Sequence, residues 1–533
     1  MKKSIIKSLL AMLLIACMMF TACSSGETTT AAPEGESTQA AGESSAEPVA
    51  VDDDFVLKCS YSGIADTLDL FNSAYSLATT TCFAQCYSPL ITRDGNHELV
   101  PMVADKWEMS EDGMTYTFHI DDKATFSNGE KITSDDVLFT FEEVKKSGSR
   151  GHTMTSVDSA ECPDASTIVF HLNYPDALFL GRVAAPNTFA IVSRKAYEEF
   201  GTEYGSSIDK AVYSGPYVPT EWEYNVSMTF KAREDYWLGA PQIKNVKVFN
   251  ITDTNGNIVA LQTGDLDFSW SSVSGSAYEQ LKNAPGVHFC DYTGCRFEVL
   301  NFYHKSGMFS DIRMRQAVAY AVNPEDALQI GVDGKGFVIR YPYDTPMQVP
   351  ALNYDSPNVI KQDLEKAKEL VKECGNEGAH VVIGSYQPDP YPALSTWLQS
   401  VLNSIGLDAE VQVMERSAWL DACNAEELTI SILSLNGSDY DMDGMINYLG
   451  AEYNGTRGNY GWYYSEKMEE YIKEAREKIG DDRADAFKKM IDLMWEDVAL
   501  IPLFDWNYSL PCRENIEVTD GLNYAVYFFK VVK

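Results

Sequence analysis

The stretch that decides the fold is LVPMVADKWEMSEDGMTYTF, residues 99–118. From Met114 to Ile120 apolar and polar residues alternate with period two, as they do along a half-buried β-strand. Asp112-Gly113 stands just before this run and supplies a turn. The same alternation recurs at Ser227–Lys231 and Val246–Ile251, so the first part of the chain is predicted to be rich in strands.

The later part of the chain has the pattern of an α/β protein. Residues 363–374 place apolar side chains at helical spacing, and Gly375 ends the run. A strand, a helix started by proline and a second strand follow, which predicts a β-α-β unit. These elements are His380–Ser385, Pro392–Ile405 and Asp408–Val413; further helices are predicted at Met468–Ile479 and Ala484–Val498, before an apolar strand at Leu500–Phe504.

A second segment, ATFSNGEKITSDDV at residues 124–137, follows the opening stretch. Together the two resemble the signature of the extracellular solute-binding proteins of family 5, the peptide and nickel class. Each shorter match is weak alone, but the matches come in the family's order and cover nearly everything after residue 51. They are Ser214–Tyr217, Asp235–Pro241, Leu261–Asp267, Asp311–Val318, Ala319–Asn323, Ile405–Leu407 and Ile501–Leu503.

The resemblance implies an α/β fold with two lobes that close like a clamp, as in periplasmic binding proteins, and an extra subdomain in the first lobe. The ligand cleft would lie between the lobes. We expect residues 52–298 and 505–533 in the first lobe and residues 299–504 in the second, so that the chain crosses between them twice. A ligand that contacts both lobes only in the closed form would favour closure.

A peptide ligand needs a carboxylate for its α-ammonium group, because a buried ammonium without a counter-charge is very costly. Peptide-binding members carry this acid in a segment like GWxxDYxxP, which LNGSDYDMD at residues 435–443 resembles. The resemblance puts Asp439 in the acid's position, beside Asn436, Gly437 and Tyr440.

This segment also departs from the family pattern, because Asn436 replaces the tryptophan and Asp443 the proline. Asp441 and Asp443 therefore stay open as register alternatives, as does an acidic loop in solvent. A calcium loop is disfavoured, since the downstream Gly and Glu spacing is missing.

Other ligand contacts are expected from three places. Dipeptide-type members carry an arginine near the start of a second-lobe helix, and residues 387–397 contain none, which disfavours strict dipeptide specificity. Arg457 and Trp462, near Tyr463, are candidates for a carboxylate site or a sugar-stacking wall, with core packing as the alternative. The loop 77–83 of the first lobe, with Thr81 and Cys82, is expected to offer backbone partners to an extended peptide.

The N-terminus has the pattern of a secretory signal, with three lysines before an apolar run from Leu9 to Phe20 that is too short to span a membrane. Phe20–Cys23 resembles the bacterial lipobox, so we expect removal of residues 1–22 and acylation of Cys23. Cys17 fits the pattern too, but it would leave an apolar stretch exposed in the mature protein. Residues 23–51 are rich in small and acidic residues and predict a disordered tether.

The net charge, the cysteines and the histidines restrict which partners, disulfide bridges and metal sites we expect. The formal net charge of −36 excludes nucleic acid. Cys290 and Cys295 flank Asp-Tyr-Thr-Gly and are candidates to bridge a hairpin turn, with free buried thiols as the favoured alternative. The seven histidines include no closely spaced pair, so we expect no metal site and no cofactor.

These features predict a lipid-anchored, extracytoplasmic protein, monomeric and without enzymatic activity, that delivers oligopeptides to the permease subunits of an ABC importer. An oligosaccharide receptor of the same family is the alternative, because aromatic residues make up 12% of the chain. A secreted hydrolase is the rival from another class, but the sequence has neither GxSxG nor HExxH.

Overall fold

The computed structural model describes residues 53–533 except 62, 74–76, 95–97, 271–272, 274, 343, 345–351, 388–389, 426, 437–441, 443, 456–457, 519–520, 523–524, 527–530 and 533. The predicted signal, Cys23 and the tether lie outside the described residues. Within the described part, no helix combines the length and the apolar character that crossing a bilayer requires.

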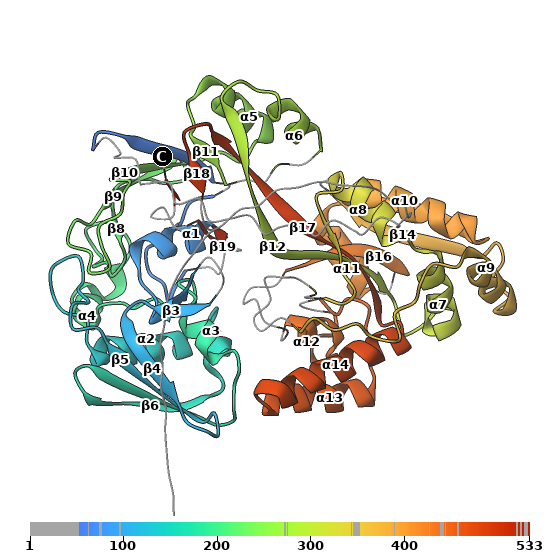
Figure 1. Cartoon of the computed structure of the whole chain (residues 1–533), viewed down its shortest axis with the longest axis horizontal. Helices are drawn as coiled ribbons and strands as arrows, with labels where there is room; N and C mark the ends of the chain where they lie inside the picture. Colours follow the sequence, from blue (N-terminus) through green and yellow to red (C-terminus); the bar gives the residue numbers. More distant parts are fainter. Residues whose placement is uncertain are drawn as a thin grey trace, which may run out of the picture. The chain divides into compact units, whose positions relative to one another are not determined.

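The main sheet has eleven strands, ten of them in the order β15-β14-β16-β12-β17-β11-β1-β10-β9-β8, with β13 added to β17. The two longest strands, β12 and β17, are antiparallel and run side by side through the middle of this sheet (Figure 1). The strands are β15 (Asp408–Met414), β14 (His380–Tyr386), β16 (Ile430–Asn436), β12 (Val287–Phe302), β17 (Leu500–Arg513), β11 (Phe268–Ser269), β1 (Val56–Tyr61), β10 (Asn245–Asn250), β9 (Ser227–Ala232), β8 (Tyr217–Glu223) and β13 (Gly336–Val338).

A separate four-stranded antiparallel sheet, in the order β4-β5-β7-β6, is built from the opening stretch and its partners. The predicted strand at 114–120 is confirmed as β5, whose residues alternate between half-buried and buried, with Phe118 fully buried. The side chain of Asp112 accepts hydrogen bonds from Ser110 Oγ and Met114 N in the preceding turn. The strands are β4 (Ala104–Met109), β5 (Thr115–Ile120), β7 (Thr167–Leu172) and β6 (Val157–Asp164), and helix α2 (Ser134–Lys146) contacts β6 and β7.

The predicted β-α-β unit is confirmed. Strands β14 and β15 are parallel, and α10 (Tyr391–Ser404) connects them. α9 (Leu364–Glu373), α13 (Glu466–Glu477) and α14 (Gly480–Glu496) match the other predicted helices. α9 begins at Asp363, whose side chain accepts a hydrogen bond from Lys366 N.

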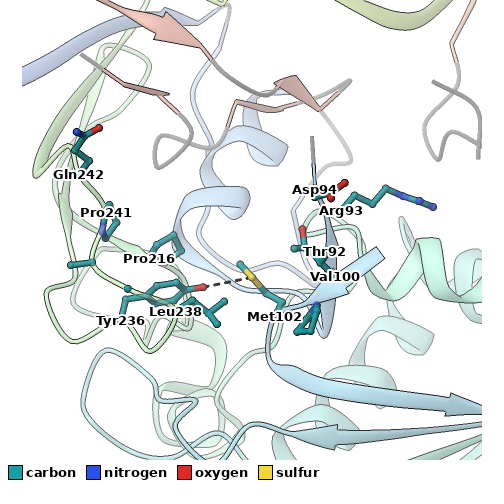
Figure 2. A pocket seen from close by; sticks show the side chains of 13 residues that line it. Thr92, Arg93, Asp94, Val100, Met102, Pro216, Tyr236, Leu238, Pro241 and Gln242 are labelled. Carbon is teal, nitrogen blue, oxygen red and sulfur yellow. Dashed lines mark hydrogen bonds between the residues drawn. The ribbon is translucent and has the colours of Figure 1, made fainter. Parts of the chain in front are cut away.

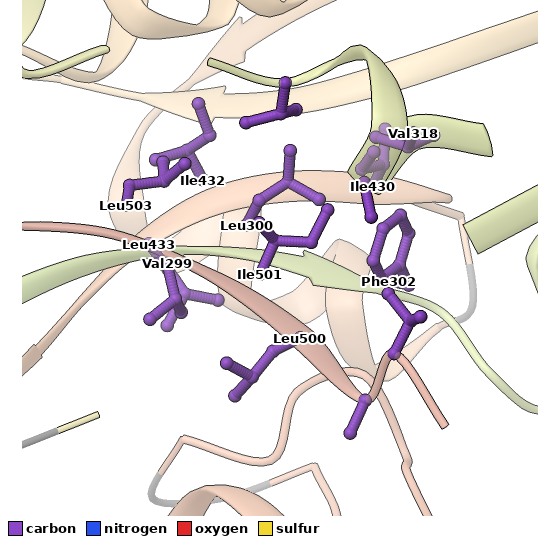
Figure 3. Packing of buried hydrophobic residues seen from close by; sticks show 14 of the residues in the cluster. Val299, Leu300, Phe302, Val318, Ile430, Ile432, Leu433, Leu500, Ile501 and Leu503 are labelled. Carbon is purple, nitrogen blue, oxygen red and sulfur yellow. The ribbon is translucent and has the colours of Figure 1, made fainter. Parts of the chain in front are cut away.

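The strands of this half are buried on both faces. Leu300 pairs with Ile432 and Val299 with Leu433, and because neighbouring residues of a strand point to opposite faces, the two pairs lie on opposite sides of the sheet (Figure 3). All four side chains are at most 2% exposed. Burial on both faces explains why these segments are mostly apolar, without the strict alternation of a half-buried strand.

One alternative for the local structure is excluded, and one expectation was wrong. Residues 291–294 form no hairpin turn, because β12 continues through them, so Cys290 and Cys295 are roughly 16 Å apart along the strand and too far for a bridge. Cys290 is a free thiol. Residues 77–83 are no loop either, because they lie in helix α1 (Leu77–Cys86).

Two large hydrophobic cores meet along β12 and β17. Cys290 packs in one core and Phe297 in the other, and on β17 the change comes between Trp506 and Leu510. Both strands therefore carry the chain from one core to the other, as the predicted two-lobed architecture requires. The residue boundaries proposed for the lobes stay predictions.

Candidate ligand-binding site

Three parallel strands end at one edge of the second core. β14 pairs in parallel with both β15 and β16, so Tyr386, Met414 and Asn436 stand at their carboxyl ends. In open α/β sheets, ligands bind in the crevice outside the carboxyl ends of such strands. Asn436 is a predicted ligand-binding residue, and Tyr386 comes directly before the segment 387–397 that lacks the arginine of dipeptide-type members.

Arg296 on β12 lies at the same edge, directly opposite Asn436 in the strand register. Its guanidinium donates to Ser434 Oγ at 3.0 Å and to Tyr391 Oη at 2.9 Å, and it stacks 4.2 Å from the ring centroid of Trp506. The side chain remains 30% exposed. A partly exposed cation held by three elements is suited to an anionic ligand group.

Glu298 is the counter-charge of this arginine. It is fully buried, with Oε1 4.0 Å from Arg296 Nε and 2.9 Å from Trp506 Nε1, which donates to it. Burial raises the pKa of Glu298, and Arg296 and Trp506 oppose that shift. The strands that join the two cores thus carry a buried ion pair at the site's edge.

A second arginine marks the edge from the β15 side. Arg416 is exposed, begins helix α11 (Arg416–Asn424), and lies 4.9 Å from the ring centroid of Tyr386. Tyr386 in turn stacks on Tyr391 and tilts against Trp419, at centroid distances of 4.2 and 5.0 Å. These three rings are at most 3% exposed, so they support the arginines and offer no free face for stacking.

Most of the predicted acidic stretch lies outside the described residues. Gly437, Asp439, Tyr440, Asp441 and Asp443 lie outside the described residues, as does Arg457. Asn436 is the last residue of β16.

Met442, within the same stretch, is buried and lines a cavity of about 460 Å³. The walls of this cavity come from both sides of the crossing strands. Arg93, Trp107 and Leu180 belong to segments before β12, whereas Met442, Arg483 and Phe487 belong to segments after it. A ligand here would contact both lobes, which is the property that couples binding to closure.

A neighbouring cavity of about 340 Å³ lies entirely among residues before β12 (Figure 2). Tyr236 points its hydroxyl at Met102 Sδ, 3.8 Å away, and Arg93 also lines the larger cavity. Because this second cavity has walls from one side only, ligand in it would not by itself draw the lobes together.

Two first-lobe candidates lie on helix α1. Cys82 is 3% exposed and its Sγ contacts Met228 Sδ at 3.8 Å, so its side chain belongs to the core. Thr81 is its neighbour on the helix. Backbone groups inside a helix are paired with one another, so only the N–H groups of the first turn could serve a ligand.

Trp462 lies away from this edge. His304, just beyond β12, donates its backbone N–H to Gly461 O, and Tyr303 donates to Thr429 O, which puts Trp462 near the amino end of β16. At about 3.3 Å per residue, the seven residues of β16 hold its two ends roughly 20 Å apart. The structure therefore does not bring Trp462 together with Asn436.

Sequence reasoning missed Arg296, Glu298 and Arg416. A usable signal was present for two of them, because Arg296 and Glu298 are charged residues within a largely apolar strand, on either side of Phe297. Arg416 had no local signal; only the parallel pairing of β15 with β14 brings it to the edge.

Two cores, two crossing strands and a cavity walled from both sides define a two-lobed solute-binding protein. A family model for the bacterial extracellular solute-binding proteins, family 5 middle region, matches residues 98–457. The chain belongs to that family.

The similar proteins are distant in sequence but alike in length. Heme-binding protein A of Haemophilus influenzae is 23% identical over 484 residues, covering 83% of this chain and 84% of that protein. Oligopeptide-binding protein AppA of Bacillus subtilis is 23% identical over 480 residues, covering 84% and 86%. The solved structure of AppA from Bacillus subtilis in complex with a nonapeptide has a TM-score of 0.70 at 20% identity, covering 90% of this chain and 98% of that one.

Proposed function

We propose that this protein captures oligopeptides outside the cytoplasm, anchored by a lipid on Cys23, and passes them as a monomer, without catalysis, to the permease subunits of an ABC importer. The observation that carries the proposal is the gathering of charged groups at the carboxyl edge of β14, β15 and β16. One relative of similar length is named as an oligopeptide-binding protein, which supports the same ligand class.

The charged groups at the carboxyl edge of β14, β15 and β16 suit a peptide ligand, which has an ammonium group at one end and a carboxylate at the other. Arg296 and Arg416 offer guanidinium groups from β12 and α11, and a guanidinium binds a carboxylate through two parallel hydrogen bonds. The predicted acid, Asp439, comes three residues after the end of β16 in the sequence and would meet the α-ammonium group. Arg416 begins α11, outside the residues 387–397 where dipeptide-type members would carry their arginine.

The oligosaccharide alternative is weaker on this geometry. Tyr463 is 4% exposed, and its hydroxyl donates to Asp497 Oδ2 at 2.6 Å. At the carboxyl edge, the rings of Tyr386, Tyr391 and Trp419 are also buried, because they pack against one another. A sugar-stacking wall needs open ring faces, and Tyr464, 60% exposed, is the one large aromatic side chain near Trp462 that is mostly open among the described residues.

Isothermal titration of the purified protein with tri- to hexapeptides, free or N-acetylated, tests the proposal. Free peptides should bind, and Asp439→Asn should weaken them at least tenfold while acetylated peptides change less. Asp441→Asn, two residues along, tests the register alternative, because a selective loss of free-peptide binding in this variant, with none in Asp439→Asn, would move the acid to Asp441. Binding of oligosaccharides or heme without any peptide would overturn the peptide assignment, and equal losses for free and acetylated peptides would overturn the role of Asp439.

A further inference from the structure

Four metal-ligating side chains gather near the start of β12, six to eight residues before Arg296 on the same strand. His288 and Cys290 are two residues apart on β12, so their side chains share one face of the strand. His288 stands directly opposite Cys512 on β17, which puts Cys512 on that face as well. The thiols of Cys290 and Cys512 are in hydrogen-bonding contact.

The turn after β17 brings the fourth side chain. Ile516 N donates to Arg513 O at 2.9 Å, and the chain then continues as β18 (Glu517–Val518). This return places Glu517 Oε2 3.4 Å from His288 Nε2 and Val518 N 3.4 Å from Cys290 Sγ. Three separate segments therefore converge on one point.

The separations between the donor atoms fit a tetrahedral metal centre. Zinc binds sulfur at about 2.3 Å and nitrogen or oxygen at about 2.0–2.2 Å, so tetrahedral angles put an N···O pair about 3.4 Å apart and an N···S pair about 3.6 Å apart. The observed distances are 3.4 Å for His288 to Glu517 and 3.7 Å for His288 to Cys290. All three donor atoms lie within 4.8 Å of one another.

We propose that His288, Cys290 and Glu517 form a binding site for Zn²⁺ or a divalent ion of the same class, with a water molecule as the fourth ligand. Thiolate, imidazole and carboxylate together favour such an ion over Ca²⁺ or Mg²⁺, which take oxygen ligands. His288 and Glu517 have side chains 33% and 61% exposed, which gives an ion a route from solvent. The ion would fasten β18 to the crossing strand β12.

Cobalt substitution tests the site on the full chain, kept reduced with a phosphine. Titration with Co²⁺ should give a sulfur-to-metal charge-transfer band with one ion per chain, and Zn²⁺ should displace it. Cys290→Ser should abolish the band, and Glu517→Gln should weaken Co²⁺ binding at least tenfold; Glu517 is exposed, so that variant should fold even if Cys290→Ser does not.

The matched control is His380→Gln, because His380 lies 3.4 Å from Asp408 and 3.6 Å from Glu410 but has no thiol near it among the described residues. This variant should bind Co²⁺ as the parent does. A charge-transfer band that survives Cys290→Ser, or Co²⁺ binding unchanged by Glu517→Gln, would overturn the assignment. So would a reduced chain that binds neither metal and forms only a Cys290–Cys512 disulfide on exposure to oxygen.

Discussion

The two ends of β16 carry different chemistry. At the amino end, several buried polar groups are paired with one another: Asn459 Nδ2 donates to Gly450 O and Tyr463 O, and the hydroxyl of Tyr463 donates to Asp497. At the carboxyl end, Arg296 and Arg416 have side chains that are partly or fully open. The difference teaches that aromatic richness marks packing here, whereas partly exposed charges on strand and helix ends mark the ligand edge.

The largest expected effect comes from breaking the ion pair at the carboxyl end. Arg296→Met leaves Glu298 buried without its counter-charge and should lower the free energy of unfolding by about 3 kcal/mol, the low end for buried pairs because Arg296 is 30% exposed. Urea denaturation measures it. Adding Glu298→Met should restore most of the loss, and a double variant as unstable as the single one would contradict the pairing.

At the amino end, His304 should make the stability of the protein depend on pH. Burial, followed by the charge of Arg315, lowers the pKa of His304 to about 3, and its Nε2 donates to Ala499 O at 2.8 Å. Because the pKa of His304 is lower in the folded protein than in the unfolded chain, its contribution to the free energy of unfolding is fully present above the unfolded pKa near 6.5. That contribution is lost as the pH falls toward 3, by at most about 1.4 kcal/mol per pH unit. Urea midpoints of His304→Gln should change less between pH 7 and 5 than those of the parent; parallel curves would refute the assignment.

Tyr463→Phe tests the difference between the two ends of β16 by removing a single hydroxyl at the amino end. Loss of the hydrogen bond to Asp497 should cost about 1.5 kcal/mol of stability, as expected for a bond to a charged group. Peptide affinity, measured by calorimetry, should not change. A large fall in affinity would show that ligand reaches this end after all.

Arg416→Gln is the reciprocal test at the carboxyl end. It should weaken peptide binding about tenfold, which corresponds to about 1.4 kcal/mol, while the urea midpoint hardly moves, because Arg416 is exposed. Lys467→Gln, another exposed cation beside a tyrosine ring, is the control and should leave affinity unchanged. Stability loss without affinity loss would assign Arg416 to packing on Tyr386.

Local patterns predicted the elements whose signals lie within one segment. The helix at 364–373 and the flanking strands followed from periodicity alone, and the family resemblance supplied the two-lobed fold. β12 was missed, because Asp291-Tyr-Thr-Gly looks like a turn and only pairing with β17 keeps it extended. α1 was taken for a loop from its position in the family pattern, and its three consecutive threonines, which are β-branched, gave no helical signal.

Only part of the candidate site could be predicted from the sequence, again because strand pairing is not visible in local patterns. The segments after β14 and β16 were identified, but the two arginines converge through strand pairing between distant parts of the chain. Arg296 and Arg416 are far apart in sequence, and neither belongs to a motif.

The position of β17 in the chain has a consequence for biosynthesis. The first core contains Leu57 and Tyr61 from the start of the described chain and Leu510 and Cys512 from near its end. A nascent chain cannot complete that core until almost all of the protein has been synthesised, and contacts this distant in sequence form slowly. Late completion leaves the chain unfolded for longer, which is the state in which an exported polypeptide is threaded through a membrane.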